Sequence, residues 1–111
     1  MKATKTTDTW TSKDTFNTVK SKSLADCDNQ TITIAAIAIG NDISNEDGRT
    51  VEAGYIRSAD GQMFNTISKT ALQQLDALID MMEEGEEFTV KICRQKCKND
   101  KKREFVYFDM L

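Results

Sequence analysis

The chain has 111 residues with 15 Lys and Arg against 18 Asp and Glu, which gives a formal net charge of −3. This length allows one small domain with its own core, and no apolar run approaches the roughly 20 residues that span a bilayer. The complete absence of histidine excludes Ser-His-Asp and Cys-His catalysis and every zinc site that requires imidazole. The polar N-terminus lacks the apolar core of a secretory signal, so we expect a protein that stays inside the cell with its cysteines reduced.

The first third of the chain predicts a polar start followed by one long strand. We expect residues 1–13 to form either a flexible tail or a frayed first strand. Residues 16–22 predict a short strand in which Phe16 and Val19 reach the core. The run TITIAAIAIG, over 31–40, is almost continuously apolar and rich in β-branched residues, which is typical of a strand buried on both faces or bent by a bulge.

Two Asp-Gly dipeptides, at 47–48 and 60–61, predict the turns of a β-meander. The first ends a polar loop over 41–50, and a returning strand is expected over 51–58. The second leads into a short strand over 62–66. Together with the long strand before them, these segments predict three antiparallel strands.

The clearest element is an amphipathic helix after Ser68. Its apolar residues follow the spacing of a helix that buries one face, and they are Ala71, Leu72, Leu75, Leu78, Ile79 and Met82. Ser68 fits the N-cap position, and Gly85 fits the position just past the helix end. The alternating segment over 88–92 and the aromatic segment over 104–111 then predict the last two strands.

The predicted order is strand, long strand, strand, short strand, helix, strand, strand. A mainly β domain with one helix between its third and fourth main strands is typical of a five-stranded OB-fold barrel. PH-like and other α+β folds have similar elements and remain alternatives. We expect residues 1–111 to form a single OB-like domain.

No pattern in the sequence matches a catalytic or metal site. Cys93 and Cys97, with Cys27 far upstream, provide three thiols at a spacing that differs from structural zinc sites. The acidic loop over 41–50 lacks the Gly and Glu positions that an EF-hand requires. The carboxylates of the helix fit its water-facing side. The sequence therefore predicts a protein that is not an enzyme and that holds no metal and no cofactor.

Charge is segregated along the C-terminal part of the chain. The helix and its exit, over 76–87, carry six acidic side chains, whereas seven of the thirteen residues over 91–103 are Lys or Arg. Because exposed charges are screened beyond a Debye length of about 8 Å at physiological salt, an acidic helix on the far side of a small domain hardly cancels a basic patch. This segregation favours a polyanionic partner despite the acidic net charge.

Strand alternation places aromatic and basic side chains on one face of the predicted sheet. If Ile56 faces the core, Tyr55 and Arg57 project together from the opposite face. Such a face suits a single strand of nucleic acid, because bases stack on aromatic rings and cations hold the phosphates. The residues expected to stack on bases are Tyr55, Phe64 and Tyr107, and those expected to contact phosphates are Arg57, Lys69, Lys91, Arg94, Lys96 and Lys98. The alternative is that these rings belong half to the core and that the charges are only solvated.

One segment, over 58–82, carries a combination of motifs. It contains Ala-Asp-Gly at 59–61, an aromatic ring at Phe64, Ile-Ser-Lys-Thr at 67–70 where the helix opens, and Leu-Ile-Asp at 78–80 within the helix. This combination resembles small phage-encoded single-stranded-DNA-binding proteins of the type that serve protein-primed replication, and a weaker likeness extends over most of the chain. The resemblance implies a five-stranded OB-fold that coats single-stranded DNA with little sequence preference during replication.

The resemblance also implies a role for one residue and a set of partners. Phe64 matches an aromatic counted among the base-stacking residues of that family. The loop over 41–50 departs from the family pattern because it is shorter and has no aromatic, so one expected stacking position is in doubt. The implied partners are single-stranded DNA and replication proteins in the host cytoplasm, with no membrane, and the protein is expected to be either a monomer or a homodimer.

Two other functions fit the same residues. A small phage inhibitor or adaptor could use an exposed sheet edge, or present the acidic helix as a mimic of DNA, although such a mimic has no need of the basic cluster over 94–103. An OB-like RNA binder would differ only in its ligand, since recognition of the 2′-hydroxyl cannot be read from these residues.

Overall fold

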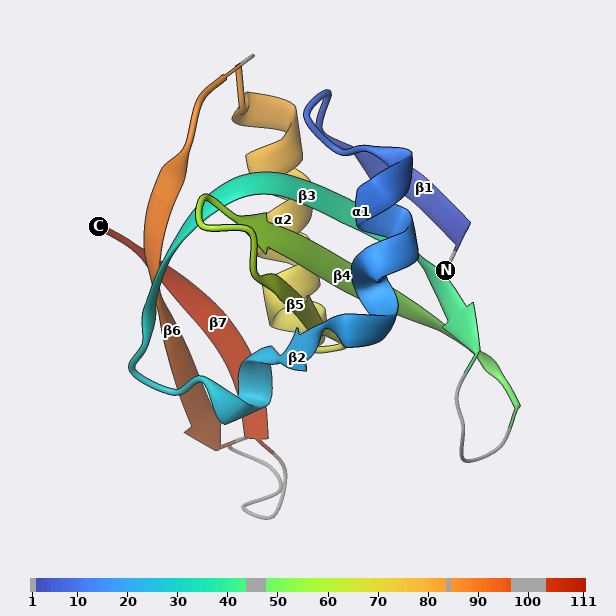
Figure 1. Cartoon of the computed structure of the whole chain (residues 1–111). Coiled ribbons are helices and arrows are strands. Elements are labelled where there is room, and N and C mark those ends of the chain that lie inside the picture. The colour runs from blue at the N-terminus through green and yellow to red at the C-terminus, as the bar shows by residue number, and fades with distance from the viewer. Residues whose placement is uncertain (1, 44–47, 84, 97–103) are drawn as a thin grey trace.

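The structure is a curled β-sheet with one long helix packed on it (Figure 1). This computed structural model describes residues 2–43, 48–83, 85–96 and 104–111. The elements in chain order are β1 (Lys2–Thr6), α1 (Ser12–Asn17), η1 (Thr18–Lys20), β2 (Lys22–Ser23), η2 (Leu24–Asp26), β3 (Thr31–Ile43), β4 (Thr50–Ser58), β5 (Met63–Thr66), α2 (Lys69–Met81), β6 (Phe88–Lys96) and β7 (Glu104–Met110).

Strand β3 organises the sheet because it pairs with three neighbours. It runs antiparallel to β4 along most of its length, while its other edge pairs with β6 at residues 31–34 and with β1 at residues 38–41. The order of the sheet is β2-β5-β4-β3-β6-β7, with β1 beside β3. A register shift between Ile34 and Ala36 interrupts the pairing of β3 with β4. Such a bulge bends a strand, and the bend lets one edge of β3 serve two different strands.

The long apolar run is buried on both faces of β3. Ile37 and Ile39 belong to the hydrophobic core cluster, and Ala36 and Ala38, which point the other way, are fully buried as well. The β-branched residues suit the pleated surface of a strand. The sequence left open burial on both faces or a bend at a bulge, and β3 has both. The strand extends three residues beyond the expected end, to Ile43.

Helix α2 packs its apolar stripe against the sheet. Leu72, Leu75 and Leu78 are at most 6% exposed and join the core cluster. Gly54 of β4 permits this close approach, because a Cβ atom there would lie 2.6 Å from Cδ1 of Leu75. Each buried Leu side chain stabilises the fold by about 1.5–3 kcal/mol, so the helix is held mainly by this stripe, as its periodicity predicts.

Two side chains, one just before α2 and one within it, also complete the free edge of β7. The Ser68 hydroxyl donates to the Val106 carbonyl oxygen at 2.9 Å and accepts from the Val106 amide at 3.2 Å. Six residues further along, the Gln74 amide group donates to the Phe108 carbonyl oxygen at 2.9 Å and accepts from the Phe108 amide at 2.8 Å. Two residues of β7 thus satisfy their outer backbone groups with side chains where a strand would otherwise pair.

The N-terminal region differs most from its prediction. The strand expected over 16–22 is wrong, because residues 16–20 belong to α1 and η1 and only Lys22, the first residue of β2, lies in a strand. A capping box starts the helix: the Thr11 hydroxyl accepts from the Asp14 amide, and the Asp14 carboxylate accepts from the Thr11 amide. Phe16 and Val19 therefore lie on the surface, 75% and 84% exposed, and not in the core.

The number of elements differs as well. In the described part of the chain the sheet has seven strands and not five, since β1 and β2 join the expected set, and α1 adds a second helix. Ser68 occupies the predicted N-cap position, but its side chain makes no capping bond to the helix. The helix ends at Met81, so Gly85, at φ +78°, lies in the turn that follows and not directly past the helix end. Neither described helix is long and apolar enough to cross a membrane.

Replacing Gln74 with Glu tests the side-chain cover of β7. The carboxylate can accept from the Phe108 amide but cannot donate to the Phe108 carbonyl oxygen, so two oxygen atoms would face each other in a half-buried site. We expect Gln74→Glu to lower the free energy of unfolding by about 1–3 kcal/mol in a urea titration at pH 7. The matched control is Gln73→Glu, which adds the same charge at an exposed position of the same helix and should change stability by less than about 0.5 kcal/mol. Equal stabilities of the two variants would contradict this role for Gln74.

Candidate nucleic-acid interface

A groove lies between β5 and β7, which are not paired with each other in the described part of the sheet. Its volume is about 650 Å³. The lining residues are Ser23, Ala25, Asn65, Thr66, Ile67, Ser68, Lys69, Thr70, Phe105 and Val106. The segment 23–25, the end of β5 and the start of α2 form one wall, and β7 forms the other. We call this feature the β5–β7 groove.

Phe105 lines the β7 wall of the groove, and the ring of Tyr107 lies next to it on β7. Phe105 is half-buried, and its ring centroid lies 6.0 Å from that of Tyr107, with the two planes tilted by 42°. The pairing register places Tyr107 opposite Cys93, on the outward side of the β6–β7 hairpin. Electrostatic repulsion from Cys93 and then burial raise the pKa of the Tyr107 hydroxyl. Tyr107 has the outward position expected from strand alternation.

The expected phosphate contacts are divided among different surfaces. Lys69 lines the groove at the start of α2. Lys91 lies on the outward side of the hairpin, whereas Arg94 and Lys96 project from the opposite side near the end of β6, where both are exposed. Lys98 lies outside the described residues. Of the described set, Lys91 thus lies on the side of the hairpin that carries the two rings, and Lys69 lies in the groove that Phe105 lines.

The surface position expected for Tyr55 and Phe64 is wrong. Phe64 is 4% exposed and belongs to the hydrophobic core cluster. Tyr55 is 6% exposed, and its hydroxyl donates to Oδ2 of Asp42 at 2.5 Å. Burial and then this hydrogen bond raise the pKa of Tyr55. In this structure neither ring offers a free face to a nucleobase.

Arg57 is also engaged within the protein. Its Nη1 atom lies 2.6 Å from Oδ2 of Asp14, and Nη2 donates to the Thr9 carbonyl oxygen at 3.4 Å. The N-terminal segment therefore covers the part of β4 that strand alternation left exposed. Alternation identifies which side chains share a face, but only the packing of α1 shows that this face is occupied.

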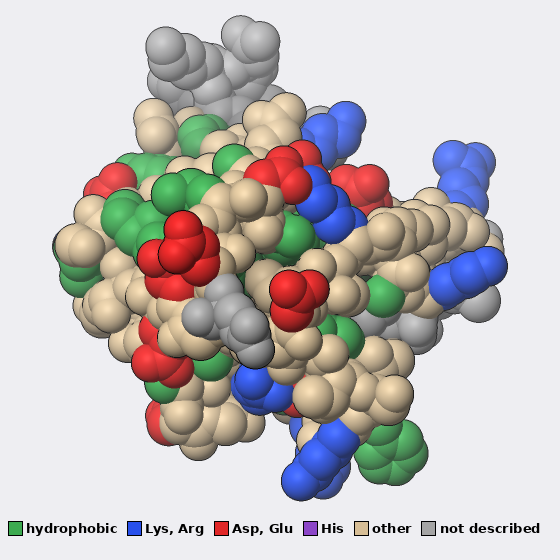
Figure 2. Space-filling model, turned by 90° about the horizontal axis from the view of Figure 1, so that it is seen from above, with side chains coloured by type: hydrophobic (Ala, Val, Ile, Leu, Met, Phe, Trp, Pro, Cys, Tyr) green, Lys and Arg blue, Asp and Glu red, His purple; other side chains and the backbone are tan. Residues whose placement is uncertain are grey.

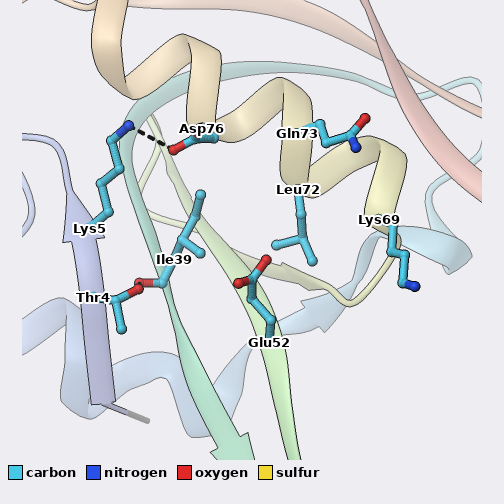
Figure 3. Close-up of a pocket in the computed structure, with 8 residues that line it drawn as sticks. All are labelled: Thr4, Lys5, Ile39, Glu52, Lys69, Leu72, Gln73 and Asp76. Carbon is cyan, nitrogen blue, oxygen red and sulfur yellow. Dashed lines mark hydrogen bonds and ion pairs between the residues drawn. The ribbon is translucent and has the colours of Figure 1, made fainter.

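A second groove, between β1, β4 and α2, has a volume of about 590 Å³ (Figure 3). Lys5 lies 2.7 Å from Oδ1 of Asp76 and 2.6 Å from Oδ1 of Asp80, and these hydrogen bonds raise the pKa of its ammonium group. Glu52 directs its carboxylate toward the groove, and Lys69 lies at the other end of it. The charge of Lys5 is already balanced by two carboxylates, and the Glu52 carboxylate faces the groove. This groove therefore suits a phosphate backbone less well than the β5–β7 groove does.

Exposed acidic side chains gather at the end of the molecule where α2 finishes. Figure 2 views this end, and Asp and Glu side chains occupy its centre and one side while most Lys and Arg lie toward the margins. The exposed acids on α2 and the segment after it include Asp80, Glu83, Glu86 and Glu87. The β5–β7 groove opens at the other end of the helix, whose 13 residues span about 20 Å. Since this separation exceeds two Debye lengths of about 8 Å, the acids hardly affect the groove.

Comparison with known proteins adds one decisive observation. The model of a family described as "Phage Single-stranded DNA-binding protein" matches residues 1–110. The chain belongs to this family. No curated protein and no solved structure matches the chain. The resemblance read from residues 58–82 is therefore confirmed at the level of the family.

In this phage single-stranded-DNA-binding protein, sequence reasoning missed one ring of the groove. Phe105 shares a side of β7 with Tyr107 and lines the groove, whereas the sequence selected only Tyr107. Strand alternation over 104–111 contained the signal, because residues two apart in a strand point the same way. What alternation lacked was the position of β5 and α2, which create the groove beside Phe105.

The cysteines of this phage protein lie in different environments. Cys27 is 1% exposed and burial raises the pKa of its thiol, while Cys93 is partly exposed, with burial and then Asp109 raising its pKa. Among the described residues, no group of three or more Cys, Asp or Glu side chains is arranged to hold a metal ion.

We expect the two thiols to react differently with iodoacetamide in a Cys97→Ser background. The Cys93 thiol should react slowly at pH 7 and faster as the pH rises through its raised pKa, because only the thiolate is nucleophilic. The Cys27 thiol should react only when denaturant unfolds the protein. Mass spectrometry of alkylated peptides measures both rates, and rapid labelling of Cys27 in the native protein would contradict this burial.

Removing the charge of Arg57 should destabilise the protein. Asp14, whose side chain is 6% exposed, would be left without its charged partner, and we expect Arg57→Gln to lower the free energy of unfolding by about 3 kcal/mol. The double variant Asp14→Asn with Arg57→Gln should recover much of this loss, since no unpaired buried charge remains. Lys13→Gln, next to Asp14 but exposed, is the control. Equal stability of all variants in a urea titration would contradict a stabilising pair between Asp14 and Arg57.

Proposed function

We propose that the protein coats single-stranded DNA without regard to sequence during phage replication, by stacking bases on aromatic rings and holding phosphates with Lys and Arg. The observation that carries this proposal is the β5–β7 groove, which has Phe105 at one wall and Lys69 at the other, with the Tyr107 ring 6.0 Å from that of Phe105 on β7. Rings supply a stacking surface that every base can use, and cations track the backbone. The protein acts by binding alone, without catalysis and without a cofactor.

We propose further that β3 to β7 with α2 form an OB-like barrel. The order β3, β4, β5, α2, β6, β7 has the helix after the third strand of this set, as an OB-fold has. OB-folds bind ligands across their second and third strands, between the loop after the first strand and the loop before the last. Here the N-terminal segment occupies β4 through the pair between Asp14 and Arg57. The DNA path is therefore displaced toward the neighbouring seam, which is the β5–β7 groove.

The proposed roles follow from the positions of the side chains. Phe105 and Tyr107 stack on bases. Lys69 contacts phosphates in the groove and Lys91 contacts them on the outward side of the hairpin, while Arg94, Lys96 and Lys98 extend the basic surface along the hairpin. Because the acidic end of the molecule lies about 20 Å from the groove along α2, DNA approaches the end of the molecule that carries the groove. Replication proteins of the phage are the further partners that this role implies.

The proposal is tested with a fluorescein-labelled oligo-dT in an anisotropy titration. We expect Phe105→Ala and Tyr107→Ala each to weaken binding about 5- to 100-fold, because base stacking contributes about 1–3 kcal/mol per ring. The matched control is Tyr55→Phe, which alters a buried ring and should leave affinity unchanged. Circular dichroism confirms that each variant is folded at the temperature used. If Phe105→Ala and Tyr107→Ala both bind with wild-type affinity, the groove is not part of the DNA-binding site.

A salt series separates the phosphate-binding residues from the stacking residues. Removing one cation that binds a phosphate of single-stranded DNA should reduce the slope of log affinity against log salt by about 0.7. We therefore expect Lys69→Gln and Lys91→Gln to flatten the slope, and Tyr107→Ala to lower affinity at every salt concentration without changing the slope. Lys5→Gln serves as the comparison on another surface. An unchanged slope in both the Lys69 and the Lys91 variant would contradict their binding to phosphates.

A further inference from the structure

We propose that Phe16 is a second base-stacking position, flanked by Lys13 and Lys20, on the α1–η1 segment that covers β4. This inference rests on the proposed binding of single-stranded DNA and extends it to a surface that neither the sequence pattern nor the groove includes. Phe16 is 75% exposed, which makes it the most exposed aromatic ring of the described residues. Burying such a ring against a base removes apolar surface from water, so the site gains from a ligand with a flat aromatic face.

The ring stands on an anchored platform and not on a loose end. The Trp10 indole N–H donates to the Thr15 hydroxyl at 2.9 Å within the segment. On one side, Asp14 is bound to Arg57 of β4 at 2.6 Å, and on the other the Asn65 amide group of β5 donates to the Ser21 hydroxyl at 2.7 Å. The α1–η1 segment is therefore tied to β4 through the helix itself and to β5 through Ser21, directly after η1. A ring held in place loses less conformational entropy on binding than a ring on a mobile chain.

The charges around Phe16 favour a polyanion. Lys13, Lys20 and Lys22 are all exposed. Between residues 9 and 25 the one acidic residue is Asp14, which is 4% exposed and already paired with Arg57. Phosphates that approach the ring thus meet lysines on both sides and no free carboxylate from this segment. A patch of this composition combines the two elements of non-specific single-strand binding, a stacking ring and cations along the backbone.

The platform also continues into the β5–β7 groove. A further hollow of about 410 Å³ lies beside the platform and is lined by Asn17, Lys20, Lys22, Gly61, Gln62 and Met63. Lys22 and Ser23 are the two residues of β2, and Ser23 lines the β5–β7 groove. The two hollows therefore lie on either side of β2, where consecutive residues line one and the other. A single strand that leaves the groove over β2 reaches Lys22 and Lys20 before it reaches Phe16.

The experiment compares oligo-dT lengths and Phe16 variants by anisotropy. An oligonucleotide long enough to cross β2 should bind Phe16→Ala about tenfold more weakly than wild type, whereas the shortest oligonucleotide that still binds through the groove should bind both equally. Phe16→Trp should restore affinity and Phe16→Leu should not, because stacking requires a ring. The matched control is Val19→Ala, which removes apolar surface at a neighbouring position that is 84% exposed and should leave affinity unchanged. Because both positions are highly exposed, the variants should fold as the wild type does, and circular dichroism checks this.

The outcomes are separable. Wild-type affinity in Phe16→Ala, or full affinity in Phe16→Leu, overturns the inference while loss of binding in Phe105→Ala still supports the groove. Sedimentation equilibrium measures the molar mass of DNA-free Phe16→Ala. If that mass is lower than the mass of the wild type while the affinity per chain for DNA is unchanged, the inference is overturned and the ring is assigned to contact between copies. Failure of the wild-type protein to bind any oligo-dT overturns the proposed function itself.

Discussion

The bend in β3 is the constraint on which the rest of the structure depends. Because the register shifts between Ile34 and Ala36, one strand pairs with β4 along one edge and with β6 and β1 along the other. The sheet therefore curls, and β5 and β7 come to flank a groove without pairing to each other in the described residues. Ser68 and Gln74 satisfy backbone groups at the β7 edge. This cover leaves the seam open to a ligand while protecting an edge that could otherwise pair with another chain.

The charge layout follows from the direction of α2. The helix begins beside the groove and ends at the acidic face, so its length separates a surface that can attract phosphates from one that repels them. Carboxylates near the C-terminus of a helix oppose its dipole. Lys5 of β1 offsets this effect by bonding both Asp76 and Asp80. An acidic protein can in this way offer one favourable end to a polyanion. The net charge of −3 therefore does not describe the local charge at that end.

Local patterns predicted most of the elements and one part of the candidate site. The helix from Lys69 and the long strand from Thr31 followed from hydrophobic periodicity, which depends only on neighbouring residues. The outward position of Tyr107 followed from strand alternation. Alternation could not reveal that α1 would pack on β4 and bind Arg57, or that Phe64 would point into the core. These outcomes depend on segments more than 30 residues apart in the chain, such as the pair between Asp14 and Arg57.

By itself, the sequence determined the family, the mainly β character and the separation of acidic from basic segments, because motifs, periodicity and charge are properties of contiguous residues. The tertiary structure alone decided which rings are accessible. Phe64 and Tyr55 became core or near-core residues, while Phe16, which the pattern placed inside, stands at the surface. The physical reason is that exposure is set by what packs on a face. The capping box at Thr11 starts helix α1, and the charge pair of Asp14 with Arg57 holds this helix on β4. The N-terminal segment therefore covers that face of the sheet.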